Sequence, residues 1–211
     1  AGIKWMSEIL LGGKISKPTK AQKEYLLDIY KSNERMIKLV NDLLNVSHIE
    51  TGRKFDIVKK KTDVVAIVDQ ILLDNRNLLA EKKVNVIKCK GAPDKFLLNI
   101  DGDKIGQAYN NLINNAIKYS KNGGEIEIGC THNEKSVVFM IRDSGIGIPQ
   151  KQQSKMFTKF FRADNASGQE ADGTGLGLYI AKSIIEAHGC KIWFESKENI
   201  GTTFYFELPL K

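Results

Sequence analysis

The spacing of apolar residues predicts a helical segment at the start of the chain. Apolar positions three and four apart predict one helix over Ile3–Leu11 and a longer one from about Thr19 to Thr51, ending at Gly52. The longer helix carries a seam with coiled-coil spacing, in which Asn33 would set the register. The seam consists of Leu26, Ile29, Asn33, Met36, Val40 and Leu43. We expect a helical hairpin that forms a four-helix bundle with a second copy, the alternative being a lone helix packed on its own domain.

After Gly52, strand-like and helix-like segments alternate along the chain. The expected helices are Val64–Leu79, Gly106–Ser120 and Leu176–His188, the second one started by Asp101 or Asp103 as N-cap. The expected strands are Lys54–Lys60, Val84–Lys90, Phe96–Ile100, Gly124–Thr131, Ser136–Arg142, Lys191–Glu195 and Thr203–Leu208. The fourth and fifth strands form an expected antiparallel pair, and regular βαβ units are absent. The pattern predicts an α/β (α+β) two-layer sandwich with a mixed β-sheet and helices on one face, preceded by the helical hairpin.

Composition is that of a soluble globular protein, with 42% apolar and 27% charged residues among 211. No apolar run is long enough to cross a bilayer, so we expect no membrane segment here. The net charge of +7 arises in residues 1–90, where 18 basic face 11 acidic side chains; residues 91–211 carry 14 of each. Apart from Phe55, no aromatic residues interleave with the basic ones. A solvated lysine-rich surface is therefore expected, and no nucleic-acid partner.

The cysteines and histidines show no spacing typical of disulfide or zinc sites. Cys89, Cys130 and Cys190 are odd in number and lack a CxxC pair, which predicts free thiols in a reducing compartment. His188 precedes Gly189 at an expected helix end, where an imidazole can meet the last carbonyls, and His132 falls in an expected hairpin turn. Structural roles are predicted for both histidines.

The segment Gly106–Ser120 has an unusual polar face. Asn111, Asn115 and Lys118 lie at i, i+4 and i+7, so a helix places them on one side. Neutral oxygens suit a hard cation, and an ammonium group suits a phosphate. The row therefore predicts a phosphate–metal site, the alternative being an ordinary amphipathic helix with two incidental asparagines.

Two glycine-rich loops follow this helix. Asp143–Gly147 comes directly after a strand, and Gly173–Leu178 opens a helix whose N-terminal N–H groups can bind phosphate. The second loop lacks the GK[ST] ending of a P-loop. Asp143, at the end of an apolar strand, can accept a hydrogen bond from the exocyclic amine of adenine, or it can simply cap the turn.

In this order, the motifs resemble the ATP-binding domain of sensor histidine kinases, part of the superfamily shared with gyrase, mismatch-repair and chaperone ATPases. Asn111–Ser120 resembles the N box, Asp143–Gly147 the G1 box, Phe157–Arg162 the F box and Gly173–Leu178 the G2 box; the final glycine motif is Gly201–Phe204. Residues 1–52 resemble a partial dimerisation and phosphotransfer hairpin. Residues 53–211 resemble the ATP-binding catalytic domain, with a mobile lid at 149–172.

The resemblance implies roles for individual residues. Asn115 would coordinate Mg²⁺, Asn111 would support the metal or its waters, and Lys118 would touch a phosphate of ATP. Asp143 would read adenine, with Thr203 behind it. Lys159 and Arg162 of the lid would approach the terminal phosphates, so the implied catalytic set is Asn111, Lys118, Lys159 and Arg162. The other implied nucleotide-binding residues are Tyr119, Gly145, Gly147, Phe160, Gly173, Thr174, Gly175, Leu176, Gly177 and Leu178.

The chain departs from the family pattern at a few positions. Lys159 stands where the family often has Arg, and it lacks the guanidinium fork. Thr158 stands where an acid is frequent, and Asn199 where a glycine is common.

One position bears on the reaction. In the hydrolysing relatives a Glu one turn before the metal-binding Asn activates water, whereas Asn111 stands here and a carboxamide cannot act as a general base. We therefore expect transfer of the ATP γ-phosphoryl group to a histidine, for relay to an Asp of a response regulator receiver domain. The alternatives are a gyrase-like ATP hydrolase and a non-catalytic nucleotide-binding or dimerisation module.

The phosphate acceptor is expected outside this sequence. Family resemblance puts it in a His-Glu-Leu-Arg-x-Pro-like box, and Ala1–Lys4 resembles the residues that follow that box. His48 lies at the far end of the second helix with no Pro behind it, so we do not expect it to be the acceptor. The chain is thus expected to be a cytoplasmic fragment of a longer protein, and the sequence leaves open whether that protein is anchored in a membrane. Dimerisation with a second copy through the hairpin would be weakened by truncation, and the fragment would bind Mg–ATP without labelling itself.

Overall fold

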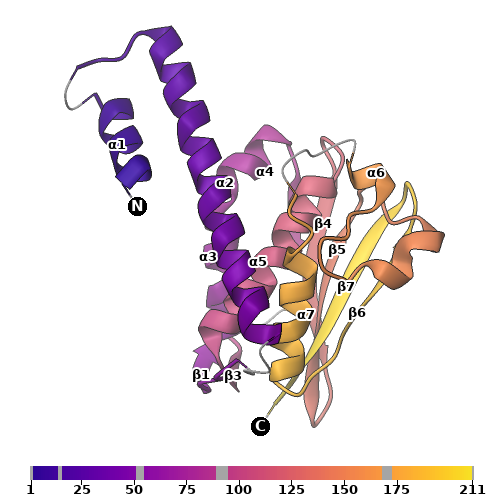
Figure 1. The fold of residues 1–211 in the computed structure, drawn as a ribbon. Coiled ribbons are helices and arrows are strands. Elements are labelled where there is room, and N and C mark those ends of the chain that lie inside the picture. The colour runs from indigo at the N-terminus through magenta and orange to yellow at the C-terminus, as the bar shows by residue number, and fades with distance from the viewer. Residues whose placement is uncertain (1, 14–15, 51–54, 89–94, 168–172, 211) are drawn as a thin grey trace. The chain divides into compact units, whose positions relative to one another are not determined.

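The computed structural model describes residues 2–13, 16–50, 55–88, 95–167 and 173–210 (Figure 1). Contacts along the chain divide it into two compact units, one up to Ser47 and the other from His48 onward. The division lies close to the expected domain boundary after residue 52, which itself stays a prediction.

The first unit is a helical hairpin, as expected. Helix α1 spans Gly2–Leu11, and helix α2 spans Lys20–Glu50 and continues into the second unit. Lys4 of α1 forms an ion pair with Glu34 of α2 at 2.9 Å, which joins the two helices.

The apolar seam predicted on α2 is largely uncovered in the single chain. Ile29, Met36 and Val40 expose 49%, 53% and 54% of their surface, so the chain by itself does not bury them. Asn33 is buried, and its Nδ2 has no hydrogen-bond partner among the described residues. An unburied seam of this kind is suited to further helices, and the second copy stays a prediction.

The second unit is built on a five-stranded mixed sheet with strand order β2-β4-β5-β7-β6. The strands are β2 (Asn85–Lys88), β4 (Glu125–His132), β5 (Ser136–Asp143), β6 (Ile192–Lys197) and β7 (Gly201–Pro209). β4 and β5 pair antiparallel, which confirms the expected pair, whereas β2 joins β4 in parallel. The mixed sheet predicted from the pattern is therefore confirmed.

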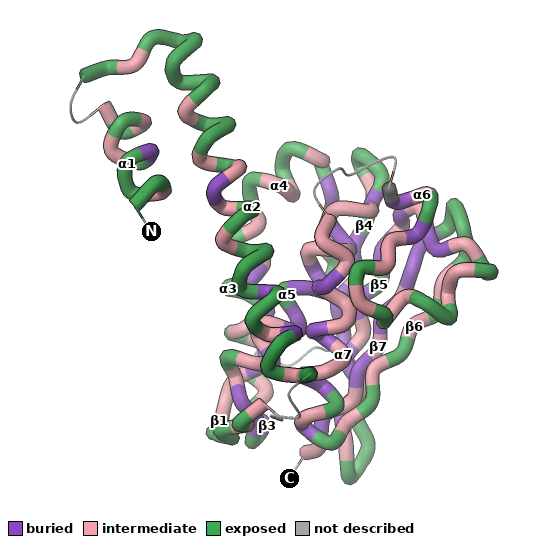
Figure 2. Tube along the Cα trace, viewed as in Figure 1, coloured by how far each residue is buried: buried purple, intermediate pink, exposed green. Residues whose placement is uncertain are grey.

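Three helices, α3 (Val64–Asp74), α5 (Gly102–Tyr119) and α7 (Gly177–Ala187), lie on one face of this sheet (Figure 1). The buried residues concentrate between the helices and the sheet (Figure 2). α5 begins at Asp101, whose Oδ1 accepts a hydrogen bond from the Lys104 N–H at 3.1 Å, so Asp101 rather than Asp103 is the N-cap. The predicted two-layer sandwich with helices on one face is confirmed.

Two predicted elements before α5 differ from the structure. The strand expected over Lys54–Lys60 is wrong: the described part of that segment forms no strand before β1 (Lys60–Asp63), which pairs antiparallel with β3 (Leu97–Ile100) as a separate two-stranded sheet. The alternation in the lysine-rich segment therefore does not correspond to pairing.

The helix expected over Val64–Leu79 is interrupted at Asn75. α3 ends at Asp74, and a short helix, α4 (Arg76–Glu81), follows Asn75. The Asn75 N–H keeps the helical bond to the Ile71 carbonyl at 3.1 Å, and Nδ2 donates to the same carbonyl at 2.9 Å. Asn is a poor helix former because its side chain can hydrogen-bond nearby backbone groups, and the apolar pattern does not register that preference.

The region expected to form a lid contains two short helical segments, η1 (Gln150–Lys155) and α6 (Asp164–Ser167). The rest of the expected lid, residues 168–172, lies outside the described residues. Asn199, in the turn between β6 and β7, has a positive φ of 64°, which explains why this position is compatible with glycine.

The structural role predicted for His188 is confirmed. This buried residue caps α7, and its Nδ1 lies 2.8 Å from the Ile184 carbonyl oxygen, while the Asp101 N–H donates to Nε2 at 3.3 Å. Burial lowers the pKa of His188, consistent with a neutral imidazole. Cys130 and Cys190 are free thiols, as expected, and Cys89 lies outside the described residues.

Replacing Phe206 by Ala should lower the free energy of unfolding by about 3–5 kcal/mol, because the ring is fully buried against Tyr109 and Phe139 at centroid distances of 4.8 and 5.2 Å. Urea denaturation of both proteins measures the difference. Ile200→Ala removes a side chain that is 58% exposed and should change the free energy by less than about 0.5 kcal/mol. Equal losses in the two variants would contradict this assignment of the core.

Candidate nucleotide-binding site

Two carboxamides of the polar row of α5 have no hydrogen-bond partner among the described residues. Asn111 is buried, and its Nδ2 has no hydrogen-bond partner in the described part of the chain. Asn115 is half-buried, and the described residues give its carboxamide no hydrogen bond. Buried amides normally find partners, so an orphaned one at this position points to a group that the described residues do not supply.

The first glycine loop surrounds a buried carboxyl group at the end of β5. Asp143 Oδ1 accepts hydrogen bonds from the backbone N–H groups of Gly145, at 2.9 Å, and Thr202, at 3.3 Å. Burial raises the pKa of Asp143 to about 6, although these two N–H groups act in the opposite direction. Oδ2 accepts no hydrogen bond from the described residues, so it can accept one from a ligand.

This loop packs directly against the C-terminal end of α5. The Ile146 N–H donates to the Tyr119 carbonyl at 3.2 Å. A Cβ at Gly145 would lie 2.2 Å from the same carbonyl oxygen, and a Cβ at Gly147, where φ is 62°, would lie 2.1 Å from the Lys197 oxygen. Both glycines are therefore required by close backbone approach, and they bring Asp143 to the helix that carries Asn115.

The second glycine loop meets the same polar row from the other side. α7 starts at Gly177, and an added Cβ there would lie 3.4 Å from Asn111 Oδ1. Thr174 Oγ1 accepts a hydrogen bond from the Leu176 N–H at 3.3 Å. Leu176 is fully buried and therefore belongs to the core beneath this loop. The start of a helix is favourable for phosphate oxygens.

The predicted lid residues lie beside the second glycine loop. Phe160 has a φ of 61° and is 61% exposed, and a Cβ at Gly175 would lie 2.6 Å from the Phe160 carbonyl carbon. Arg162 donates from Nη2 to the Ala166 carbonyl at 3.3 Å and lies against Gly173. A left-handed conformation is costly for an aromatic residue, and such strain is often found at functional sites.

Lys159 is held by other side chains of the second unit. It forms an ion pair with Glu50, and its Nζ lies 5.3 Å from the centroid of the Tyr179 ring. The Glu50 carboxylate raises the pKa of Lys159. Contact of Lys159 or Arg162 with phosphate stays a prediction.

The prediction that Thr203 lies behind Asp143 is wrong. Asp143 pairs with Thr202 across β5 and β7, and Thr202 is buried whereas Thr203 is half-buried on the opposite face. The alternation of side chains along β7 distinguishes the two threonines, because the side chains that face the core are those of Thr202, Phe204, Phe206 and Leu208. Since side chains alternate with a period of two, a shift of one residue selects the wrong face.

Two further residues of the site were not identified from the sequence. The Oγ of Ser196 accepts a hydrogen bond from the Ile148 N–H at 2.9 Å. Gln153 donates from Nε2 to the carbonyls of Ile148, at 3.1 Å, and Ser196, at 3.0 Å. Ser196 could have been placed by pairing β6 with β7, whereas no spacing or motif marks Gln153.

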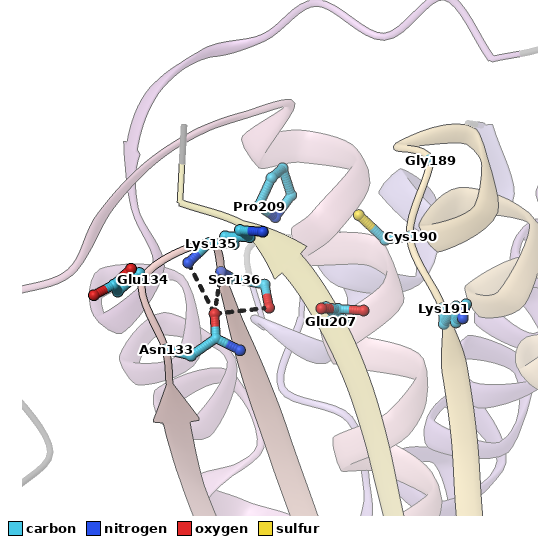
Figure 3. A pocket seen from close by; sticks show the side chains of 9 residues that line it. All are labelled: Asn133, Glu134, Lys135, Ser136, Gly189, Cys190, Lys191, Glu207 and Pro209. Atoms are coloured by element: carbon cyan, nitrogen blue, oxygen red, sulfur yellow. Dashed lines mark hydrogen bonds between the residues drawn. The ribbon is translucent and has the colours of Figure 1, made fainter.

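A cavity of about 690 Å³ lies elsewhere, at the turns that join β4 to β5 and α7 to β6 (Figure 3). Its lining residues are Asn133, Glu134, Lys135, Ser136, Gly189, Cys190, Lys191, Glu207 and Pro209. None of the predicted nucleotide-binding residues lines it, so this cavity is distinct from the junction of α5 and the glycine loops.

The described ranges contain no cluster of three or more His, Cys, Asp and Glu side chains able to hold a metal ion. A divalent cation at the α5 row would therefore be held by carboxamide oxygens together with oxygens of the ligand, a set that suits Mg²⁺. Among the described helices, none has the length and apolar character that crossing a membrane requires.

Comparison with known proteins identifies the family. Residues 100–211 match the histidine kinase-, DNA gyrase B-, and HSP90-like ATPase family, and residues 1–52 match the His Kinase A (phospho-acceptor) domain. The chain belongs to this ATPase family. The family membership inferred from the N, G1, F and G2 boxes is thus confirmed.

Several sensor histidine kinases resemble the chain over most of its length. The sensor histidine kinase WalK of Bacillus subtilis is 39% identical over 190 residues, which cover 89% of this chain and 30% of WalK. The chain thus spans about a third of the length of the curated relatives it matches.

Two solved structures share the fold. Full-length ShkA in complex with AMPPNP gives a TM-score of 0.75 at 22% identity over 99% of this chain and 42% of ShkA. The histidine kinase ThkA in complex with the response regulator protein TrrA gives 0.67 at 23% identity over 99% of this chain and 59% of ThkA.

Replacing Asp143 by Asn should raise the free energy of unfolding of the nucleotide-free protein at pH 7 by about 1–3 kcal/mol. The pKa of the carboxyl group is about 6 in the fold against an ordinary 3.8, so the fold disfavours its charge. Its contribution to stability is complete below pH 3.8 and is lost as the pH rises through 6. Denaturation at several pH values measures it: the advantage of the variant should grow between pH 4 and 6 and then level off. An advantage that does not change with pH would contradict the burial of this carboxylate.

Proposed function

We propose that this chain is the catalytic region of a sensor histidine kinase, which binds Mg–ATP and transfers the γ-phosphoryl group to a histidine. The observation that carries the proposal is the row of Asn111 and Asn115, without hydrogen-bond partners among the described residues, at the junction of both glycine loops. An unsatisfied amide beside the start of a helix suits a phosphate–metal ligand better than it suits a protein core. ATP binding is further supported by the family match.

In this proposal each element of the site has one task. The Asp143 carboxylate accepts a hydrogen bond from the exocyclic amine of adenine, and the ring of Tyr119 lies against the nucleotide. The N–H groups of residues 173–178 and the Lys118 ammonium bind phosphate oxygens. Phe160, Lys159 and Arg162 belong to the lid segment that would close over the phosphates and exclude water.

Mg²⁺ would be held by the Asn115 carboxamide oxygen, with Asn111 supporting it or its waters. The ion would neutralise phosphate charge that the nearby cationic side chains do not fully compensate. The donor set fits this role because both carboxamides lack protein partners among the described residues.

Phosphoryl transfer is favoured over ATP hydrolysis by the chemistry of Asn111. A water molecule needs a proton acceptor to become a nucleophile, and a carboxamide has no basic site at neutral pH. A histidine nucleophile needs no such base at this position, so the residues present suit transfer to a side chain. A hydrolase or a non-catalytic nucleotide-binding module remains the alternative that experiment decides.

The partners follow from the same proposal. The phosphoryl group would pass from the histidine to an Asp of a response regulator receiver domain. A response regulator as partner is supported by the solved complex of the histidine kinase ThkA with the response regulator protein TrrA. The half-exposed seam of α2 would pair with a second copy of the chain. A cytoplasmic location is part of the proposal and is supported by free thiols at Cys130 and Cys190.

Asn115→Ala should weaken binding of ATP in the presence of Mg²⁺ at least tenfold, because the metal loses its protein ligand. The matched control is Asn114→Ala on the same helix, where Nδ2 donates to Asn110 Oδ1 and to the Asn110 carbonyl, both at 2.8 Å. Titration calorimetry with and without Mg²⁺ measures both variants. Retention of Mg²⁺-dependent affinity in the Asn115 variant would favour the non-catalytic module.

Incubation with γ-labelled Mg–ATP should transfer label to a separately supplied hairpin that carries a His-Glu-Leu-Arg-like box, and His48 should stay unlabelled. Labelled phosphate released without an acceptor should remain below one equivalent of protein. Mass spectrometry of the phosphorylated histidine identifies the site. Label on His48, or sustained phosphate release without an acceptor, would refute the assignment of kinase chemistry to these residues.

A further inference from the structure

Three polar residues form one row across the sheet beside the first glycine loop. Asp143 of β5 pairs with Thr202 of β7, and Thr202 pairs with Ser196 of β6. Residues directly opposite in adjacent strands point to the same face. The row therefore continues from the carboxyl group proposed to read adenine to a serine two strands away.

The hydroxyl group of Ser196 has its hydrogen-bonding capacity filled by the chain. A serine hydroxyl donates one hydrogen bond and accepts two. Ser196 Oγ lies 3.0 Å from the Gly201 carbonyl, which can only accept, so the Ser196 proton is donated there. The Ile148 N–H donates to Ser196 Oγ at 2.9 Å. One accepting position remains.

This inventory fixes the direction of the hydrogen bond to Thr202. The two hydroxyl oxygens of Ser196 and Thr202 are 2.9 Å apart, and Ser196 has no second proton to give. Thr202 is therefore the donor. Its Oγ1 is left with lone pairs only. The Thr202 backbone N–H donates to Asp143 Oδ1 at 3.3 Å, so the threonine neighbours a carboxylate that also only accepts when ionised.

We propose that Ser196 determines base specificity by taking the Thr202 proton, so that the base meets only hydrogen-bond acceptors at its six-position. The exocyclic amine of adenine can donate hydrogen bonds to the Thr202 and Asp143 oxygens. The carbonyl of a 6-oxopurine would instead face the lone pairs of these oxygens and form no hydrogen bond with them. Ser196 is a positioning residue that acts through Thr202, and the inference rests on the proposed binding of ATP.

A purely structural role for Ser196 would affect the affinities of purine nucleotides in a different way. Its hydrogen bonds to Ile148 and Gly201 support the first glycine loop and the turn before β7, and Gln153 also ties Ile148 to β6. Loss of that support would weaken binding of every purine nucleotide equally. A change in the preference between two bases, in contrast, requires a change in donor and acceptor polarity at the base.

The test compares the affinities of Mg–ATP and Mg–ITP, which differ only in the six-position of the purine and the adjacent N1. The unmodified chain should bind ITP at least tenfold more weakly than ATP. Ser196→Ala frees the Thr202 hydroxyl to donate to the 6-oxo group, which should narrow the ATP-to-ITP ratio about tenfold, the size of one good hydrogen bond. Ser196→Thr keeps a hydroxyl and should restore the original ratio.

Ser183→Ala is the matched control, because it removes a serine hydroxyl that donates to the Tyr179 carbonyl at 2.9 Å, away from Thr202. It should leave the ratio unchanged. Equal weakening of ATP and ITP by Ser196→Ala, or failure of Ser196→Thr to restore the ratio, would overturn this inference while ATP binding stands. An unmodified chain that binds ATP and ITP equally would also overturn it. An unmodified chain that binds no nucleotide would overturn the proposed function and this inference with it.

Discussion

The packing of α5 determines the geometry of everything else in the second unit. Its Ile105, Leu112, Ile113 and Ile117 are fully buried against the sheet and the neighbouring helices, and Tyr109 packs edge-on to Phe139 and Phe206. A close-packed core holds side chains in single rotamers, so this burial fixes the rotation of the helix about its axis. This fixed rotation positions the row of Asn111, Asn115 and Lys118, so that both glycine loops approach the same polar face of the helix.

Within the second unit, three unfavourable features lie where α5 meets these loops. Asp143 is buried at an energetic cost, Asn111 has an unsatisfied Nδ2 among the described residues, and Phe160 adopts a left-handed conformation. The cost would be relieved by a neutral residue in place of Asp143, an apolar one in place of Asn111 or a glycine in place of Phe160, so stability alone does not explain these residues. Their proximity separates the site from the cavity at the opposite turns, whose side chains show no comparable strain or burial. Physical cost, rather than cavity volume, therefore identifies the functional region.

The sequence predicted this arrangement well where periodic patterns and glycine motifs carry it. Helices α2 and α5 and the β4–β5 pair follow from local sequence patterns, whereas the convergence of Asn111, Gly145 and Gly177 was implied by the family resemblance of their motifs. The features that the sequence could not predict depend on which strands pair and in which register. The register of β7 distinguishes Thr202 from Thr203, and Ser196 joins the site only through a strand paired to β7. The break lies at Asn75, a poor helix former whose side chain bonds a backbone carbonyl, and apolar periodicity does not detect such a residue.

The identity of residue 111 connects packing with the proposed chemistry. Asn111 is only 8% exposed, and its oxygen lies close to where a Cβ of Gly177 would stand. A carboxylate in its place would be desolvated as Asp143 is, and its negative charge would occupy the start of α7, which the proposal assigns to phosphate oxygens. The neutral amide therefore lets α7 start directly against α5 without a desolvated charge. A carboxamide also has no basic site at neutral pH, so the residue that allows this close contact is the one on which the proposal of transfer over hydrolysis rests.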